Sequence, residues 1–322
     1  MLLDSVLLNE WHVVARSSDL AEASLLGARV LEEELVLWRV KGRANVWQDL
    51  CVHRGTRLTL GAIENDRLVC GYHGWTYNAD GECVRFPAHP EQTPPPTAKV
   101  RTYQTEEKYG LVWACLGESP GKIPAFPEWD DPSYRKIFCG PYRYRASGPR
   151  AVENFLDVAH LPFLHAGYLG EKSHAEIQDY QVDVTDGGIE ARDVLIWQPD
   201  PDGTGIGKNV NYTYRVLRPL TMSLSKKTEE GVFSIFATVT PVSESESVAW
   251  FWLALNYSHE MPEEELRAFQ DKITDQDIPV VESQRPEKLP LDLQAELHLR
   301  SDRIAVAYRK WLRQLGLTFG TA

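Results

Sequence analysis

The chain has 322 residues, enough for two domains of ordinary size that each bury a hydrophobic core. Its composition, with 43% hydrophobic and 25% charged residues, is typical of a packed globular protein and excludes a disordered or fibrous one. The 46 acidic residues outnumber the 34 basic ones, and the net charge of -12 argues against binding to nucleic acid or to an anionic membrane.

The sequence gives no indication of export or of membrane insertion. Acidic residues at Asp4 and Glu10 without a basic start argue against a signal peptide, and no apolar run is long enough to span a bilayer. Five cysteines are an odd number at low density, so a disulfide framework is not expected. We therefore expect a cytoplasmic protein in which cysteine serves as a metal ligand.

The first part of the chain predicts a small antiparallel β domain. Between residues 25 and 115, short apolar runs alternate with Gly, Asn and Asp turns. Four prolines between residues 117 and 132 exclude a helix or a central strand there, so this stretch is interpreted as a connector. The predicted domains are residues 1–140 and 141–322.

The second part predicts a sheet held by helices. Apolar residues recur at helical spacing over residues 152–165, and alternating residues indicate strands between 180 and 257. A helix is expected from Pro262, and a final helix is expected over residues 302–315. The predicted fold class of this domain is α+β.

Two cysteine and histidine pairs lie in the first domain. Cys51 and His53 have one residue between them, and Cys70 and His73 follow after a gap of sixteen residues. In a Rieske [2Fe-2S] centre, two cysteines hold one iron and two histidines hold the other, which is the ligand set that these pairs offer. A structural zinc site is the alternative, although zinc ligands usually pair Cys with Cys and His with His.

The residues that follow these histidines suit a cluster. Gly55 and Gly74 let backbone N–H groups approach the sulfurs, and Trp75 either excludes water from the cluster or belongs to the ordinary core. The other cysteines lack partner spacing and are interpreted as small buried hydrophobic residues. They are Cys83, Cys115 and Cys139.

A second metal site is expected in the second domain. Asp157 and His160 share one face of the predicted helix, whereas His160 and His165 lie about 140° apart around a regular helix. Pro162 lies between the two histidines and permits a kink that brings their rings together. Two histidines and one carboxylate form the facial triad of non-haem Fe(II) oxygenases.

The carboxylate of this triad must come from another segment. We choose Asp277, because a helix-breaking proline follows it by two residues, as one follows His160, and we keep Asp275 and Glu282 as alternatives. By itself, a histidine pair in an apolar helix is more often a packing feature than a metal site. The Rieske motif in the same chain reverses that preference.

The pattern C-x-H, sixteen residues, C-x-x-H and then D-x-x-H-x-x-x-x-H resembles the α subunits of Rieske non-haem iron oxygenases over the whole chain. Within that family the chain looks closest to the compact hydroxylases of saxitoxin-type guanidinium alkaloids. The segments that carry this closer likeness are residues 47–49, 126–132, 301–303 and 307–312. More distantly, it resembles the vanillate and dicamba O-demethylases, whose third iron ligand falls on a D-x-x-x-x-E segment that matches Asp277 to Glu282.

The resemblance implies a β-rich Rieske domain, a helix-grip catalytic domain of the START and Bet v 1 type, and a head-to-tail homotrimer. In such a ring, His73 of one subunit meets Asp157 of the next, and Asp157 holds His160 by a hydrogen bond. We assign Asn154 and Asp157 to the catalytic site. The assigned metal ligands are Cys51, His53, Cys70 and His73 for the cluster and His160, His165 and Asp277 for the mononuclear Fe(II).

The expected function is that of a Rieske oxygenase acting on a small organic molecule. It would use O2 and electrons from a separate ferredoxin or flavin reductase fed by NAD(P)H, and it would hydroxylate or demethylate an alkaloid or an aromatic compound. The chain has no G-x-G-x-x-G fingerprint after a strand, so a partner must handle the nucleotide. The alternative is an electron-transfer protein with a non-catalytic ligand-binding domain, which has no use for His160, His165 and Asp277.

Overall fold

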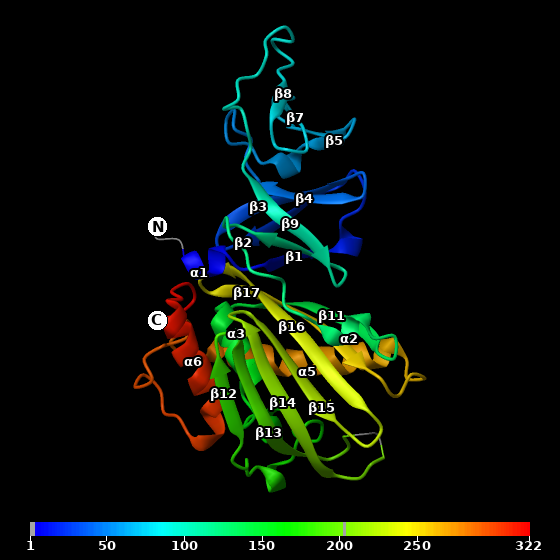
Figure 1. Cartoon of the computed structure of the whole chain (residues 1–322), viewed down its shortest axis with the longest axis vertical. Coiled ribbons are helices and arrows are strands. Elements are labelled where there is room, and N and C mark those ends of the chain that lie inside the picture. The colour runs from blue at the N-terminus through cyan, green and yellow to red at the C-terminus, as the bar shows by residue number, and fades with distance from the viewer. Residues whose placement is uncertain (1–3, 202–203) are drawn as a thin grey trace. The chain divides into compact units, whose positions relative to one another are not determined.

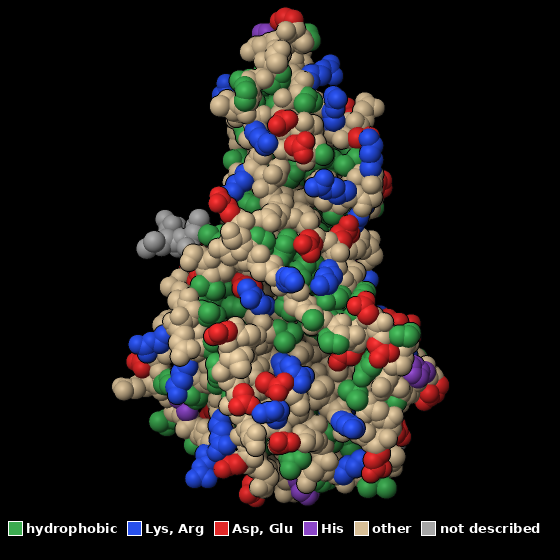
Figure 2. Space-filling model, in the orientation of Figure 1, with side chains coloured by type: hydrophobic (Ala, Val, Ile, Leu, Met, Phe, Trp, Pro, Cys, Tyr) green, Lys and Arg blue, Asp and Glu red, His purple; other side chains and the backbone are tan. Residues whose placement is uncertain are grey.

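The computed structural model describes residues 4–201 and 204–322, which fall into two compact units (Figure 1). The first unit spans Leu8–Lys122, and the second combines Asp4–Leu7 with Ile123–Ala322. Among these described residues, no helix is long and apolar enough to cross a membrane. Figure 2 shows acidic and basic side chains interspersed on the face in view, so neither charge dominates that face.

The second unit begins earlier than the boundary predicted at residue 140. Residues from Ile123 onward belong to it, and its first strand, β11 (Arg135–Tyr144), pairs with β17 (Glu246–Leu255). A proline-rich stretch identifies a connector, but it does not reveal which sheet the strand after it will join. The predicted connector therefore belongs mostly to the second unit.

Within residues 8–122, antiparallel strands form a larger and a smaller sheet. The larger sheet has the order β1-β10-β9-β4-β3-β2, and the smaller one has the order β5-β6-β7-β8. Their bounds are β1 (His12–Arg16), β2 (Leu25–Val30), β3 (Glu33–Val40), β4 (Arg43–Gln48), β5 (Ala62–Glu64), β6 (Arg67–Val69), β7 (Thr76–Tyr77), β8 (Cys83–Arg85), β9 (Thr102–Lys108) and β10 (Leu111–Cys115). The predicted antiparallel β domain is confirmed.

The core of the first unit surrounds both cysteines of the motif. Cys51 and Cys70 are buried in one hydrophobic cluster together with Trp38, Trp47 and Tyr77. Burial of these large aromatic side chains contributes strongly to the stability of this small unit. The short helices of this unit are η1 (Ser17–Asp19) and η2 (Leu58–Leu60), whereas α1 (Ser5–Leu8) belongs mostly to the second unit.

The described part of the second unit builds a seven-stranded antiparallel sheet of order β11-β17-β16-β15-β14-β13-β12. Its remaining strands are β12 (Gln181–Thr185), β13 (Gly188–Gln198), β14 (Lys208–Arg218), β15 (Thr221–Lys227) and β16 (Val232–Ser243). Its helices are α2 (Pro127–Asp130), α3 (Gly148–Leu156), α4 (Leu161–Leu164), η3 (Lys172–His174), α5 (Glu263–Ser283), η4 (Arg300–Asp302) and α6 (Arg303–Leu315). Figure 1 shows α5 crossing behind this sheet.

Two of the predicted helices of this unit are confirmed, and one is wrong in extent. The helix expected from Pro262 is α5, and the final helix is α6, which ends at Gly316 with a φ of +79°. The helix expected over residues 152–165 is interrupted between α3 and α4. The interruption precedes Pro162, because the Asp157 carboxylate accepts a hydrogen bond from the Ala159 N–H at 2.8 Å and so replaces a helical bond.

Helix α3 is fixed by a buried group of ion pairs. Arg309 of α6 donates to Glu153 of α3 and to Glu296, and Arg150 of α3 donates to Glu296 at 2.8 Å. The two arginine side chains are at most 3% exposed, so the carboxylates are needed to balance their buried positive charges. The helix that leads into the predicted iron ligands is thus held rigidly against α6.

Helix α5 is anchored along its length to β11. Tyr142 donates to Asp271 at 2.6 Å, and Arg267 donates to the carbonyl of Phe138 at 3.1 Å. One end of the helix is held by Glu282, which accepts from Arg145. These contacts fix both the position and the rotation of α5.

Candidate metal centres

The two Cys/His segments of the first unit fold as matching turns. In the first turn, the amide of Cys51 donates to the carbonyl of Thr56 at 2.8 Å, and the amide of Gly55 donates to that of Cys51 at 2.9 Å. The second turn repeats both bonds from Cys70, at 2.9 and 3.0 Å. Gly55 and Gly74 have φ values of +71° and +69°, a region that favours glycine, so the same backbone presents each thiol.

The two cysteines of this group are buried, whereas the two histidines are partly or fully exposed. Cys51 and Cys70 are 3% and 2% exposed, whereas His73 is exposed, and the rings of His53 and His73 lie 4.6 Å apart. His53 Nδ1 has no hydrogen-bond partner within the described part of the chain. Burial lowers the pKa of His53, which favours the neutral, ligating imidazole. This donor set fits a [2Fe-2S] cluster.

Two aromatic side chains complete this site. Trp75 stacks on His53 at 4.4 Å and also contacts Phe86, so it shields one face of the imidazole. The hydroxyl of Tyr77 lies 3.1 Å from Cys51 Sγ. Burial and the nearby sulfur raise the pKa of Tyr77, so the phenol keeps its hydrogen and would donate it to a metal-bound Cys51 thiolate. Sequence reasoning missed Tyr77, because nothing in its local pattern distinguishes it from a core residue.

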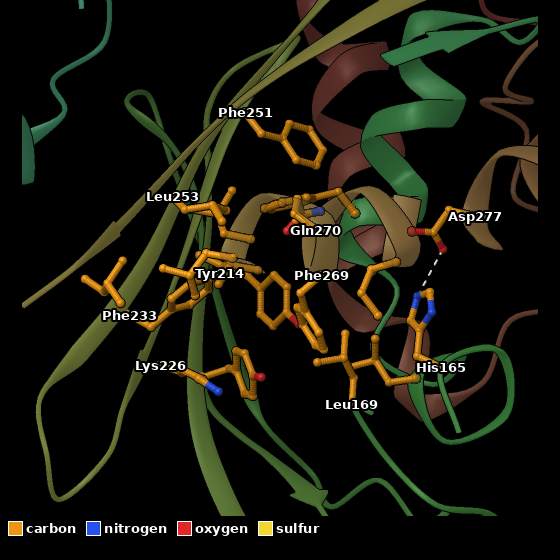
Figure 3. Close-up of a pocket in the computed structure, with 18 of the residues that line it drawn as sticks. His165, Leu169, Tyr214, Lys226, Phe233, Phe251, Leu253, Phe269, Gln270 and Asp277 are labelled. Atoms are coloured by element: carbon orange, nitrogen blue, oxygen red, sulfur yellow. Dashed lines mark ion pairs between the residues drawn. The ribbon is translucent and has the colours of Figure 1, made fainter. Parts of the chain in front are cut away.

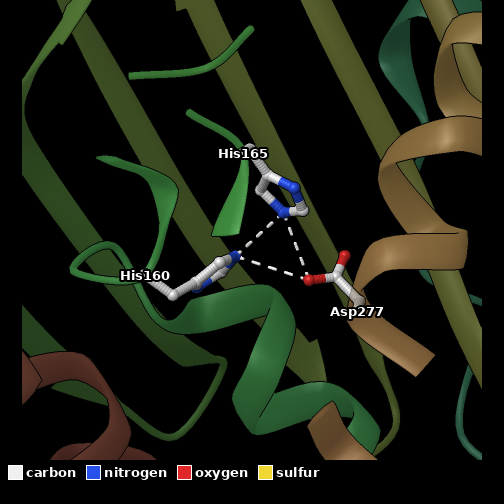
Figure 4. A group of neighbouring side chains, drawn as sticks. All are labelled: His160, His165 and Asp277. Carbon is white, nitrogen blue, oxygen red and sulfur yellow. Dashed lines mark hydrogen bonds and ion pairs between the residues drawn. The ribbon is translucent and has the colours of Figure 1, made fainter. Parts of the chain in front are cut away.

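The second site brings together His160, His165 and Asp277 (Figure 4). The two Nε2 atoms are 3.2 Å apart, and Asp277 Oδ1 lies 3.2 Å from His165 Nε2 and 3.6 Å from His160 Nε2. Ligands at right angles and about 2.1 Å from a metal ion would be about 3.0 Å apart. The spacing therefore fits three ligands on one face of a metal ion.

These three side chains come from two segments that the fold places face to face. His160 lies in the break between α3 and α4, and His165 follows α4 directly. Asp277 lies on α5. The break between the two short helices lets residues five apart point the same way, which a continuous helix prevents.

The neighbours of the triad include the other predicted catalytic residues. Asn154 Nδ2 donates to Asp277 Oδ1 at 3.3 Å. Asp157 Oδ2 lies 3.6 Å from His160 Nδ1, an ion-pair contact longer than the hydrogen bond that the family resemblance implies. Partial burial works against ionisation of Asp157, but the imidazole of His160 and the amide of Ala159 lower its pKa overall.

The alternative carboxylates do not reach the histidines. Glu282 accepts from the Arg145 guanidinium at 2.8 and 3.0 Å and from the Arg145 amide at 2.9 Å, so both of its oxygens are engaged elsewhere. Asp275 is exposed and lies outside the group of ligand atoms. Asp277 is thus the member of this trio that faces both imidazoles.

A cavity of about 450 Å³ opens onto the triad (Figure 3). His160, His165 and Asp277 line it, and its walls come from the sheet and from α5. Apolar side chains predominate in these walls, among them Leu169, Tyr214, Phe233, Phe251, Leu253 and Phe269. Gln270 and Lys226 supply polar groups. The cavity is large enough for a small organic molecule in contact with the triad.

Comparison with known proteins identifies both units. Residues 10–104 match the Rieske [2Fe-2S] domain, and residues 144–318 match the vanillate O-demethylase oxygenase C-terminal domain. The chain is 33% identical to methylxanthine N1-demethylase NdmA of Pseudomonas putida, over 95% of this chain and 88% of that protein. It is 30% identical to methylxanthine N3-demethylase NdmB of the same organism, over 96% and 89%. The solved structure of NdmA with caffeine has a TM-score of 0.84 at 30% identity, covering 96% of this chain and 90% of that one.

The chain therefore belongs to the Rieske non-haem iron oxygenases, and its catalytic domain is of the vanillate O-demethylase type. It is an oxidoreductase whose cofactors are a Rieske [2Fe-2S] cluster and a mononuclear iron. The alternative of an electron-transfer protein is not favoured. The relatives named above are N-demethylases, so they lend no support to the closer likeness to saxitoxin-type hydroxylases.

Replacing Tyr77 with phenylalanine should make the cluster harder to reduce. Reduction adds negative charge to the cluster, and a hydrogen bond to a ligand sulfur stabilises that charge. We expect Tyr77→Phe to lower the reduction potential by roughly 50 mV, which corresponds to about 1 kcal/mol for one electron. A redox titration followed by electron paramagnetic resonance measures this shift. An unchanged potential in a variant with the native visible spectrum would contradict it.

Proposed function

We propose that the protein oxidatively demethylates a small N-methyl or O-methyl compound with a planar aromatic or heteroaromatic body. The observation that carries this proposal is the apolar cavity of about 450 Å³, which contains the three predicted iron ligands in its wall. Aromatic walls suit a flat ring, and the relatives NdmA and NdmB are methylxanthine demethylases by name. Hydroxylation of a ring or an alkyl carbon, without loss of a methyl group, is the second candidate reaction.

The proposed ligands follow from the two sites. Cys51, His53, Cys70 and His73 would hold the cluster. His160, His165 and Asp277 would hold the iron, whose open positions supply O2 activation when it is bound. Asn154 would orient the Asp277 carboxylate through its 3.3 Å hydrogen bond.

The cavity residues would position the methyl group for oxidation. Tyr214, Phe251 and Phe269 can hold a planar ring by their faces and edges. The amide of Gln270 is 7% exposed, is tied to Thr274 at 3.1 Å and faces the cavity, so it can hydrogen-bond a polar edge of the substrate (Figure 3). A few polar groups among mainly apolar walls favour an uncharged or weakly polar molecule.

Electrons would come from a separate reductase or ferredoxin that is fed by NAD(P)H. In atom balance, a methyl group, O2, two electrons and two protons give a hydroxymethyl group and water. The bond from the hydroxymethyl carbon to nitrogen or oxygen then breaks, the hydroxyl hydrogen passes to that nitrogen or oxygen, and CH2O leaves as formaldehyde. The sequence has no dinucleotide fingerprint to bind the nicotinamide cofactor itself.

We further propose the helix-grip description for the second unit and a head-to-tail homotrimer for the assembly. The crossing of α5 behind the seven-stranded sheet supports the former. Exposed His73 and the 43% exposed side chain of Asp157 support the latter, because both are accessible to another subunit. In such a ring Asp157 would join His73 of one subunit to His160 of the next.

Formaldehyde release tests the proposed reaction directly. The protein, a reconstituted reductase and NADH would be incubated with methylxanthines and methoxybenzoates, and the products would be analysed by mass spectrometry. We expect one formaldehyde for each demethylated product. If the product gains one oxygen atom and no formaldehyde is released, the reaction is hydroxylation and not demethylation. No oxidised product from any member of a broad methyl-bearing panel would overturn the substrate class.

Ligand variants should separate the two metal sites. His160→Ala and Asp277→Ala should lose the mononuclear iron and turnover but keep the cluster absorbance, because the ligands lie in different units. Cys51→Ala should lose the cluster absorbance. Asp275→Ala is the matched control and should keep both metals, which iron analysis and visible spectra will measure. Retention of iron by Asp277→Ala together with its loss from Glu282→Ala would reject Asp277.

Asp157→Asn tests the proposed bridge between subunits. The change keeps the size of the side chain but removes the charge that polarises both imidazoles. We expect both metals to remain bound while electron transfer from the cluster to the iron slows severely. Single-turnover kinetics on the prereduced variant measure this step. Native rates of cluster oxidation in a fully loaded Asp157→Asn protein would refute the bridge, and a monomeric native protein would remove its geometric basis.

A further inference from the structure

The buried histidine of the triad makes a hydrogen bond that the proposed function does not use. His165 is 1% exposed, and its Nδ1 lies 2.8 Å from Gln276 Oε1. Its Nε2 faces the other two ligands and lies 3.2 Å from both His160 Nε2 and Asp277 Oδ1. Figure 4 shows the second ring nitrogen directed away from the ligand group. The two nitrogens of this ring are therefore committed to different partners.

The chemistry of metal binding decides which nitrogen carries the hydrogen. A metal ion needs the lone pair of Nε2, so the hydrogen of the neutral ring must reside on Nδ1. The amide oxygen of Gln276 is an acceptor and lies at hydrogen-bonding distance from that nitrogen. Gln276 thus accepts from Nδ1–H and holds His165 in the tautomer that can bind a metal ion.

Helix α5 gives this contact its precision. Gln276 directly precedes Asp277, so consecutive residues of one helix supply a proposed ligand and the acceptor that orients another. The Tyr142 hydrogen bond to Asp271 and the Arg267 hydrogen bond to β11 fix the rotation of the helix. A shift of α5 would move both groups together and would preserve their spacing.

The two histidines of the triad are supported in different ways. His160 Nδ1 is buried and has no hydrogen-bond partner among the residues that the structure describes, and the nearest carboxylate oxygen of Asp157 is 3.6 Å away. His165 has a close, neutral acceptor from its own chain. A neutral amide orients the ring without adding negative charge next to it. His165 is therefore preorganised within a single chain, before any partner is present.

We propose that Gln276 is a positioning residue for the mononuclear metal, because it sets the tautomer and the orientation of His165. The proposal rests on the proposed role of His165 as a ligand. Loss of such an acceptor usually weakens metal binding by about 10- to 100-fold. A carboxylate of the same length should serve as well as the amide, because it presents an oxygen at the same place.

Metal affinity in the intact protein, with its cluster in place, tests this proposal without relying on turnover. Co(II) would be titrated anaerobically into protein that lacks only the mononuclear metal, and Fe(II) affinity would be measured by competition with a chromophoric chelator. Gln276→Met keeps the length and helix propensity but removes the acceptor. Gln276→Glu keeps the acceptor. Asp275→Met places the same apolar side chain at the neighbouring exposed position as a matched control.

We expect Gln276→Met to bind both metals about 10- to 100-fold more weakly, with a changed visible spectrum of bound Co(II). Gln276→Glu and Asp275→Met should stay close to the native affinity. Native affinity in Gln276→Met, or an equal loss in Gln276→Glu, would overturn the proposal. If Gln276→Met does not fold, Gln276→Asn is the second variant, because its shorter side chain moves the acceptor away by one methylene. We expect it to weaken metal binding as well. Native affinity in Gln276→Asn would also overturn the proposal.

The ligand assignment itself is checked in the same experiment by His165→Ala. Loss of Co(II) binding in His165→Ala supports the ligand role whatever the Gln276 variants do. Undiminished binding in His165→Ala would remove the proposed function of His165 and the role of Gln276 with it. The failure of Gln276 alone is thus distinguishable from the failure of the triad.

Discussion

The packing of α5 against β11 is the constraint on which the catalytic site depends. The triad joins two segments more than a hundred residues apart, and neither segment can build the site alone. Hydrogen bonds from Tyr142 and Arg267 fix the helix, so the carboxylate of Asp277 arrives where both imidazoles point. The same helix lines one side of the cavity, so a substrate bound there would lie beside the proposed metal ligands. A displacement of α5 would therefore alter metal binding and substrate binding together.

The first unit must bury the cluster and still leave it accessible to electron transfer. Matching turns place both sulfurs in the hydrophobic core, whereas the ring of His73 is exposed at the surface of the unit. Trp75 shields His53, and the Tyr77 hydroxyl lies within hydrogen-bonding distance of Cys51 Sγ in the core. Hydrogen bonding and burial at the sulfurs are two of the factors that set the potential of such a cluster.

The parts of the sites that lie in local motifs were predictable from the sequence. The spacing of Cys51, His53, Cys70 and His73 indicates the proposed cluster ligands, because each pair belongs to one short turn. His160 and His165 were equally recognisable, although the helical pattern hid the break at Asp157 that lets them converge. That break depends on a side-chain hydrogen bond, which the spacing of apolar residues cannot reveal.

Features that depend on contacts between distant segments could not be read in the same way. The choice of Asp277 over Glu282 becomes clear only when the Arg145 contact is seen, since both carboxylates lie on the same helix. Tyr77 and Gln276 have ordinary local sequences and acquire their roles from what the fold places opposite them. The cavity walls come from several strands and one helix, so no single segment carries their pattern.

The metal content of the purified protein tests the central claim most directly, because every proposed role depends on two separate iron sites in one chain. Iron, zinc and acid-labile sulfide would be measured on protein prepared anaerobically with iron present. The account predicts about three irons and two sulfides per chain, as one Rieske cluster and one mononuclear iron require. Zinc in place of iron, or iron without labile sulfide, would contradict it.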